Sequence, residues 1–344
     1  MLTLTPKEHL YSTLNLLPTA IYDSFPAVLF GRALVLACRL GIFESLSRRS
    51  QSPAGLAESL QLHPKGAEIL LPALCAGGYL KKSGEKYHLA PQAKKWLVRS
   101  SPQYIGNFLA YIELLHSHWS YLDQTLKQGK PPQTYVEMFT EKEWEIYTLG
   151  MMDLAKLIIP HLLPTVRLPR NAQALLDVGG SHGLYSIELL KRNPSLNATI
   201  ADLPQALRTT ERIVADHGLT DRIRLLPCDI TNNSFEPQHF DVVLAFNIIH
   251  GFDHQTNRKL FDRIVLSLRN GGIIYILDQL MDDHARGLGK FLPLMVGLNL
   301  LNEIGGTAYS FDQIESVCRA AGLENVKRFQ LSLPGVVLVR AWKR

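Results

Sequence analysis

A glycine-rich stretch in the second half of the sequence has the composition of a turn that holds a nucleotide-like ligand. It reads Leu175-Leu176-Asp177-Val178-Gly179-Gly180-Ser181-His182-Gly183, an apolar run that ends in closely spaced glycines. Glycines at the end of a strand let the backbone approach a ligand closely, because they carry no side chain. The glycine spacing departs from GxGxxG, so the motif taken alone also fits a tight connection without a ligand.

Two acidic residues further along the chain indicate what the ligand is. Asp202, followed by Leu203, ends a second apolar run and stands 19 positions after Gly183. A carboxylate at about this spacing can accept hydrogen bonds from ribose hydroxyls. Asp229 and Ile230 end a third run, where the amino group of an adenine would be met. The glycines and these acids together predict an adenosine-containing cofactor.

Strands and helices alternate along segment 169–344, which must position these residues. We expect strands at 174–178, 198–202, 223–227, 241–247, 273–278, 326–331 and 335–342, and helices at 184–191, 206–216, 257–268 and 311–321. Such alternation predicts an α/β, Rossmann-like fold: a mostly parallel sheet with helices on both faces. Only Ser332-Leu333-Pro334 separates the last two strands, so they must be antiparallel.

Segment 1–100 has the pattern of a winged-helix module. A long apolar helix at 27–46, a second from Ser52-Pro53 and a third at 64–75 precede a hairpin at 79–89. Winged helices often bind DNA, but Gly66–Gly78, which covers most of the third helix, contains no Lys or Arg. Major-groove recognition uses basic and amide side chains on that helix. We therefore predict a structural or dimerisation role and no nucleic-acid partner.

Segment 101–168 is helical, rich in aromatic residues, and is expected to connect the other two segments. Most of its aromatic side chains fit core packing between helices. A few could instead line an apolar substrate pocket, and Phe108, Tyr147 and Met151 are the candidates. His116 and His118 could contact a substrate, or could be packed or solvated.

Composition limits the class of protein. The chain has 344 residues, 46% hydrophobic and 19% charged, with a net charge of +5. These values exclude a disordered protein and disfavour a dedicated nucleic-acid binder. Four dispersed cysteines without a CxxC pair predict a reducing cytoplasm, and scattered histidines predict no metal site. No secretory signal is visible, and the longest apolar stretches, Ala27–Cys38 and Phe291–Leu301, are too short to span a bilayer.

The order of motifs resembles the class I S-adenosylmethionine-dependent methyltransferases. The likeness is to small-molecule O-methyltransferases related to plant caffeate and flavonoid enzymes, in their bacterial branch. It covers nearly the whole chain: the N-terminal module, the helical connector, Asp-Val-Gly-Gly, Asp-Leu-Pro, and the segment 241–253 with its histidine. The resemblance implies S-adenosylmethionine as the cofactor, a homodimer, and an apolar pocket for a small molecule.

The resemblance also implies a role for each matching residue. Gly179 would lie under the methionine part of the cofactor, Asp202 would bind the ribose, and Asp229 with Ile230 would frame the adenine. His250 falls at the general base of the family. Asp278 falls where the family places an acidic residue, usually Glu, that orients this histidine. A neutral imidazole can accept a hydroxyl proton at cytoplasmic pH, and a carboxylate would hold its tautomer.

Two positions depart from the family pattern. Ala308 stands where a second acidic residue usually follows the paired glycines, and Phe246 replaces a basic residue four positions before the base. Glu303 could reach the space that Ala308 leaves. The segment 291–301 would cover the substrate, with Met295 and Asn299 as further pocket candidates.

Three hypotheses follow from this reading. The first is a methyltransferase that acts on a hydroxyl of an aromatic or polyketide-like molecule. The second is a relative that retains the cofactor but catalyses hydroxylation, decarboxylation or a pericyclic reaction, because the acid/base set is thinned at Ala308. The third is a winged-helix regulator that senses the cofactor.

Overall fold

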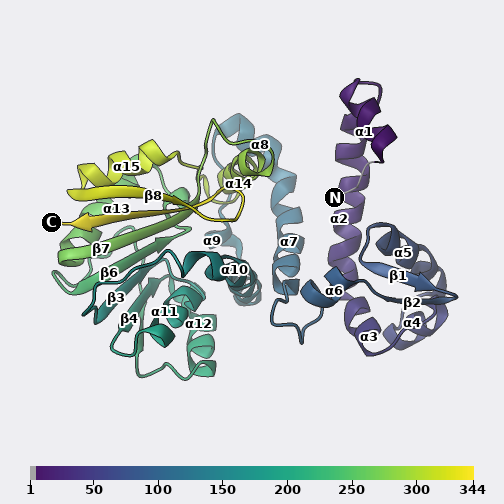
Figure 1. Cartoon of the computed structure of the whole chain (residues 1–344), viewed down its shortest axis with the longest axis horizontal. Helices are drawn as coiled ribbons and strands as arrows, with labels where there is room; N and C mark the ends of the chain where they lie inside the picture. The colour runs from purple at the N-terminus through teal and green to yellow at the C-terminus, as the bar shows by residue number, and fades with distance from the viewer. Residues whose placement is uncertain (1–4) are drawn as a thin grey trace. The chain divides into compact units, whose positions relative to one another are not determined.

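The computed structural model describes residues 5–344, which divide after Leu114 into two units (Figure 1). The division falls inside the predicted connector 101–168, whose role as a separate segment stays a prediction. The first unit contains α1 (Pro6–Thr13), α2 (Thr19–Arg39), α3 (Ile42–Arg48), α4 (Pro53–Leu60), α5 (Pro64–Ala76), β1 (Leu80–Ser83), β2 (Lys86–Leu89), α6 (Pro91–Trp96) and most of α7 (Gly106–His118).

The expected helices and hairpin of the first unit are present, with one correction. The helix predicted over 27–46 is two helices, because the chain breaks between Arg39 and Ile42. Gly41 lies there at φ +76°, a left-handed conformation that glycine adopts without strain. Ser52 caps α4 as its sequence suggested, accepting a hydrogen bond from the backbone N–H of Gly55.

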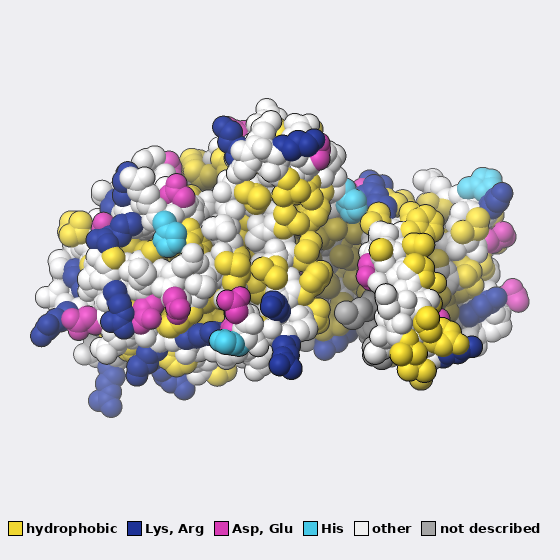
Figure 2. All heavy atoms as spheres, turned by 90° about the horizontal axis from the view of Figure 1, so that it is seen from above, with side chains coloured by type: hydrophobic (Ala, Val, Ile, Leu, Met, Phe, Trp, Pro, Cys, Tyr) yellow, Lys and Arg dark blue, Asp and Glu magenta, His cyan; other side chains and the backbone are white. Residues whose placement is uncertain are grey.

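Helix α2 is longer and more exposed than its sequence suggested. It spans 21 residues, and an 18-residue window has a mean hydropathy of 1.4 with only 11% of the window buried. The prediction that no segment is long enough to span a bilayer was therefore wrong for this helix, the one such helix in residues 5–344. Apolar side chains gather on this part of the surface (Figure 2): Leu10, Tyr11, Leu14, Leu16, Ile21, Tyr22, Phe25, Val28 and Leu29.

The second unit is built around a sheet with helices on both faces (Figure 1). Its strands are β3 (Ala174–Val178), β4 (Asn197–Asp202), β5 (Ile223–Pro227), β6 (Phe240–Phe246), β7 (Leu268–Gln279), β8 (Leu323–Gln330) and β9 (Val336–Lys343). Its helices are α8 (Leu122–Gln128), α9 (Tyr135–Met138), α10 (Glu141–Leu162), α11 (Leu184–Arg192), α12 (Pro204–Asp216), α13 (His254–Ser267), α14 (Leu288–Ile304) and α15 (Phe311–Ala320). Short 3-10 turns lie at Trp119–Tyr121 and Ile249–Gly251.

The sheet has the order β5-β4-β3-β6-β7-β9-β8. Strands β3 to β7 are parallel, whereas β9 pairs antiparallel with both β7 and β8. This arrangement confirms the predicted fold and the predicted antiparallel final pair. Alternate side chains of the central strands enter two hydrophobic clusters, one on each face. The carboxyl ends of the parallel strands therefore meet at one edge, where ligands of open α/β sheets bind.

Candidate active site

The glycine turn after β3 is packed so closely that side chains do not fit there. Gly179 has φ +68°, and a Cβ atom at this position would lie 2.5 Å from the Ile248 side chain. A Cβ atom at Gly180 would lie 2.6 Å from Cγ of Asp177. The two glycines thus keep the backbone bare at the strand end, which is the feature a ligand with a phosphate-free nucleoside and an amino-acid tail requires for close approach.

Asp202 closes β4 beside this turn. Its carboxylate accepts hydrogen bonds from the backbone N–H groups of Ser181 (2.8 Å) and Leu203 (2.7 Å). Desolvation raises its pKa to about 6, although the same two hydrogen bonds lower it in part. A carboxylate has about four acceptor positions, so two remain for a diol such as the ribose hydroxyls. The residues present therefore fit an adenosine cofactor.

Asp177 is a buried acid at this site that the sequence reading quoted without giving it a role. Its carboxylate is 1% exposed and accepts a hydrogen bond from the Ser186 hydroxyl at 2.6 Å. Desolvation raises its pKa to about 7, partly offset by that hydrogen bond, with a further rise from the Asp202 charge. An acid placed just before a glycine turn was the available signal. Asp177 anchors the turn to α11.

Asp229 lies on the surface and is committed to its own turn. It accepts hydrogen bonds from the backbone and hydroxyl of Thr231 (2.9 and 2.6 Å) and from the Asn232 amide (2.7 Å). Burial raises its pKa slightly, but these hydrogen bonds and the Arg263 charge give a net lowering. Ile230 is 6% exposed and joins the hydrophobic cluster next to α13.

The structure brings His250 and Asp278 together. Nδ1 of His250 lies 2.7 Å from Oδ1 of Asp278, although 28 positions separate them. Asp278 stands near the end of β7 and also accepts the backbone N–H of Gln279 at 2.8 Å. His250 lies in the 3-10 turn after β6, and its carbonyl accepts the backbone N–H of Thr307 at 2.8 Å. The imidazole is 14% exposed and Asp278 only 2%.

The other residues near the glycine turn pack in the protein interior. Phe246, predicted to contact the cofactor, is 5% exposed and meets Tyr185 edge to face. His182 is buried and not at the surface, which was one of the two places expected for it; its Nδ1 accepts the backbone N–H of Leu184. Burial and the charge of Lys156 lower the pKa of His182 to about 3. His254 is exposed and packs on Tyr309.

The predicted pocket residues fall on three helices. Phe108 belongs to α7 in the first unit, where its ring meets Tyr111, and Tyr147 and Met151 are half-buried on α10. Met295, Asn299 and Glu303 lie on α14. Glu303 is 4% exposed, accepts the Asn299 amide at 2.6 Å and lies 3.9 Å from His118.

An aromatic cluster surrounds Tyr147, and sequence reasoning took its other members only as general core. Tyr135 stacks on Tyr147 at 5.1 Å, and Phe139 packs on both and on His118. Burial raises the pKa values of both tyrosines, and the charges of Glu303 and Asp202 raise them further. Those charges place the cluster beside the ribose carboxylate of the candidate site.

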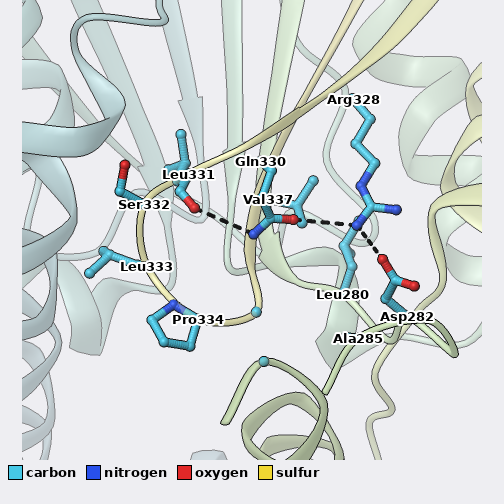
Figure 3. A pocket seen from close by; sticks show the side chains of 12 residues that line it. Leu280, Asp282, Ala285, Arg328, Gln330, Leu331, Ser332, Leu333, Pro334 and Val337 are labelled. Atoms are coloured by element: carbon cyan, nitrogen blue, oxygen red, sulfur yellow. Dashed lines mark hydrogen bonds and ion pairs between the residues drawn. The ribbon is translucent and has the colours of Figure 1, made fainter. Parts of the chain in front are cut away.

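A separate cavity of about 430 Å³ opens next to the turn between β8 and β9. Figure 3 shows Leu333 and Pro334 on one side of it and the ion pair of Arg328 with Asp282 (2.6 Å) on the other. None of the predicted site residues lines it, and the aromatic cluster does not contribute to it. We assign the chemistry to the strand ends, where the polar groups converge, and not to this cavity.

A parallel sheet with a bare glycine turn, a diol-binding carboxylate and a histidine–carboxylate pair at one edge defines a nucleoside-cofactor enzyme of the transferase type. Comparison with known families gives the particular one. Residues 119–324 match the O-methyltransferase domain, and residues 23–99 match the O-methyltransferase dimerisation domain. The chain belongs to the S-adenosylmethionine-dependent O-methyltransferase family, and S-adenosylmethionine is its cofactor.

Relatives and solved structures agree with this family. The chain is 27% identical to the 3-hydroxy-5-methyl-1-naphthoate 3-O-methyltransferase of Streptomyces sahachiroi, over 92% of this chain and 93% of the relative. It is also 27% identical to the tetracenomycin polyketide synthesis 8-O-methyl transferase TcmO of Streptomyces glaucescens, over 98% of both. The fold matches human N-acetylserotonin methyltransferase with a TM-score of 0.84 at 19% identity, over 99% of each chain.

Proposed function

We propose that this enzyme methylates a hydroxyl group of an aromatic or polyketide-like small molecule, with His250 as the general base. The 2.7 Å contact between His250 and Asp278 carries the proposal. The names of the two bacterial relatives, a naphthoate and a polyketide methyltransferase, support the substrate class.

The proposed chemistry uses the two nitrogens of His250 differently. Nδ1–H donates to Asp278, which leaves the lone pair of Nε2 to accept the proton of the substrate hydroxyl. The buried carboxylate then stabilises the imidazolium that forms. S-adenosylmethionine, when bound, supplies an electrophilic methyl group. Gly179, Asp202, Leu203, Asp229, Ile230 and Phe246 would hold or border it so that the methyl faces the oxygen.

The remaining surface favours a homodimer in a reducing cytoplasm. The exposed apolar residues of α1 and α2 need a cover, and the match to a dimerisation domain at 23–99 makes a second copy the proposed one, in preference to a membrane. Helix α5 carries a single basic residue, Lys65, so we propose no nucleic-acid partner. All four cysteines are free thiols.

Calorimetric titration with S-adenosylhomocysteine, followed by product mass analysis with phenolic acceptors, tests the proposal. We expect tight binding, products that gain one methyl group, and one demethylated cofactor for each product. A product without an added methyl group would favour the cofactor-retaining alternative that Ala308, a buried apolar side chain, keeps open. A salt-dependent shift of random duplex DNA would instead favour the regulator.

A further inference from the structure

A buried polar pair lies within the aromatic wall of the candidate site. Glu303 is 4% exposed and His118 is 6% exposed. Oε1 of Glu303 lies 3.9 Å from Nδ1 of His118, which is too far for a hydrogen bond. Nδ1 of His118 is buried and has no hydrogen-bond partner among the described residues. An unpaired buried polar atom is costly, so this nitrogen needs a partner that binds there.

Neighbouring side chains hold the pair rigidly. The Asn299 amide donates to Oε2 of Glu303 at 2.6 Å, and the Trp119 indole N–H donates to Asn299 at 2.7 Å. The Asn302 amide donates to the carbonyl of His118 at 2.9 Å, so the backbone that carries the histidine is fixed to α14. These contacts orient Oε1 and Nδ1 toward each other without joining them. A support of this kind is what a recognition point requires.

The pair lies close to the proposed base. Ile304 follows Glu303 directly, and a Cβ atom at Gly251 would lie 3.2 Å from its side chain. The backbone N–H of Thr307 binds the carbonyl of His250. The end of α14 therefore packs on the 3-10 turn that carries the base, which places Glu303 and His250 along one wall.

The gap between the two atoms fits one oxygen or nitrogen atom. An atom about 2.8 Å from both Oε1 and Nδ1 would subtend an angle of about 90° at the gap, which a hydroxyl group tolerates. A hydroxyl can donate to the carboxylate and accept from Nδ1–H at the same time. A carboxylate cannot, because it has no proton to donate and carries the same charge as Glu303.

We infer that Glu303 and His118 recognise a second, neutral hydrogen-bond donor on the acceptor molecule, such as a further ring hydroxyl, and reject acceptors with a carboxylate at that position. The aromatic rings of Phe139, Tyr135 and Tyr147 would hold the planar ring system between this point and His250. The inference rests on the proposed function, because it concerns the acceptor in the same site.

Binding to the full-length protein saturated with S-adenosylhomocysteine tests the inference. The probes are β-naphthol, the dihydroxynaphthalene isomers and the hydroxynaphthoates, titrated by calorimetry. A hydrogen bond to a charged group is worth roughly 1.5–3 kcal/mol, so the best dihydroxynaphthalene should bind about 10- to 100-fold more tightly than β-naphthol. The hydroxynaphthoates should bind more weakly than β-naphthol. Equal affinity of all dihydroxy isomers and β-naphthol would overturn the inference.

Paired variants separate recognition from a structural role. Glu303→Gln should reduce the preference for the dihydroxy probe by about tenfold and improve hydroxynaphthoate binding, with β-naphthol affinity unchanged. His118→Leu should reduce the preference, while His118→Asn, which keeps a donor near the Nδ1 position, should retain part of it. The exposed Glu211→Gln is the matched control. An equal loss for every probe would identify Glu303 as structural and refute its recognition role.

Failure of the proposed function has a different signature. If the wild-type enzyme shows the binding preference but transfers no methyl group to any probe, the inference holds and the hydroxyl-methylation proposal fails. If methyl transfer occurs without any preference, the proposed function holds and the inference fails.

Discussion

The two ends of the catalytic edge use their carboxylates in different ways. At the base end, Asp278 holds one imidazole through one 2.7 Å contact, and both groups are largely buried. At the cofactor end, Asp202 accepts two backbone N–H groups, and Asp229 is held by Thr231 and Asn232. Proton transfer depends on a single side chain, whereas cofactor binding is shared among several groups. Single substitutions should therefore cost most at the base end and least at Asp229.

Replacement of His250 by alanine should have the largest effect. Loss of a general base typically costs 10²- to 10⁴-fold, so we expect kcat to fall by about 10³-fold. Affinity for S-adenosylhomocysteine should stay within about twofold of wild type, because the imidazole has no role in the proposed cofactor contacts. Steady-state kinetics and calorimetry measure the two effects. His254→Ala, at an exposed histidine four positions on, is the control; normal turnover of His250→Ala would refute the assignment of the base.

Asp278→Asn should have the next largest effect. The amide oxygen can still accept the N–H groups of His250 and Gln279, so the geometry is retained while the charge that stabilises the imidazolium is lost. We expect kcat to fall by about 10²-fold and the alkaline range of the pH–rate profile to become more important. Asp283→Asn changes an exposed acid nearby and should leave kcat unaltered. A kcat for Asp278→Asn equal to that of wild type would make the pair merely structural.

Asp202 should make cofactor binding sensitive to acid. Its pKa in the free protein is raised to about 6 by desolvation, and only the ionised carboxylate can accept from both ribose hydroxyls. Affinity for S-adenosylhomocysteine should be constant above pH 7 and fall by up to about tenfold per unit as the pH drops below 6. Calorimetry between pH 5 and pH 8 gives the profile. Asp202→Asn should bind about 10- to 100-fold more weakly at pH 7.5 and lose the pH dependence; an unchanged slope would assign it to another group.

Folding stability should respond to the same carboxylate in the opposite direction. The folded pKa lies above the unfolded value of 3.8, so the folded state of the free protein binds the proton more tightly. The contribution of this group to stability is therefore present below about pH 4 and is lost as the pH rises toward 6. In the free protein, Asp202→Asn should remove this component from the difference in unfolding midpoint between pH 5 and pH 7. An identical pH dependence in variant and wild type would mean that Asp202 does not titrate in this range.

Asp229→Asn should have the smallest effect. The residue is exposed, and its oxygens already accept three hydrogen bonds from its own turn. We expect affinity for S-adenosylhomocysteine to fall by less than about fivefold, with kcat unaltered. A loss as large as that of Asp202→Asn would show that the two acids contribute equally and would remove the gradient between the ends of the edge.

Most of the fold was predictable because its signals are local. Apolar runs of five to seven residues, separated by amphipathic helices, located the strands of the second unit to within a few residues, apart from the starts of β7 and β8. The break at Gly41 was missed because apolar residues continue across it and a single glycine is compatible with a helix. The exposure of α2 was also beyond the sequence, since an apolar helix of this length can be a core helix or a surface waiting for a partner.

The candidate site was predictable where residues follow strand ends and unpredictable where they lie on helices. Asp202, His250 and Asp278 each stand at the end of an apolar run, and parallel strands bring such ends to one edge. Glu303 was expected to replace the acid missing at Ala308. Its printed contacts are instead with Asn299 and His118, because the helical rotation of α14 turns it toward α7 and the aromatic cluster.

The sequence by itself determined the order of strands and helices, the glycine turn and the acids and histidine at the strand ends, because each depends on neighbours within a few positions. Tertiary structure alone decided which of these groups meet and how each is solvated. The 2.7 Å link across 28 positions, the raised pKa of Asp202 and the gap between Glu303 and His118, 185 positions apart, all arise from packing between distant segments. Burial and distance in space set those properties, and neither is a property of local sequence.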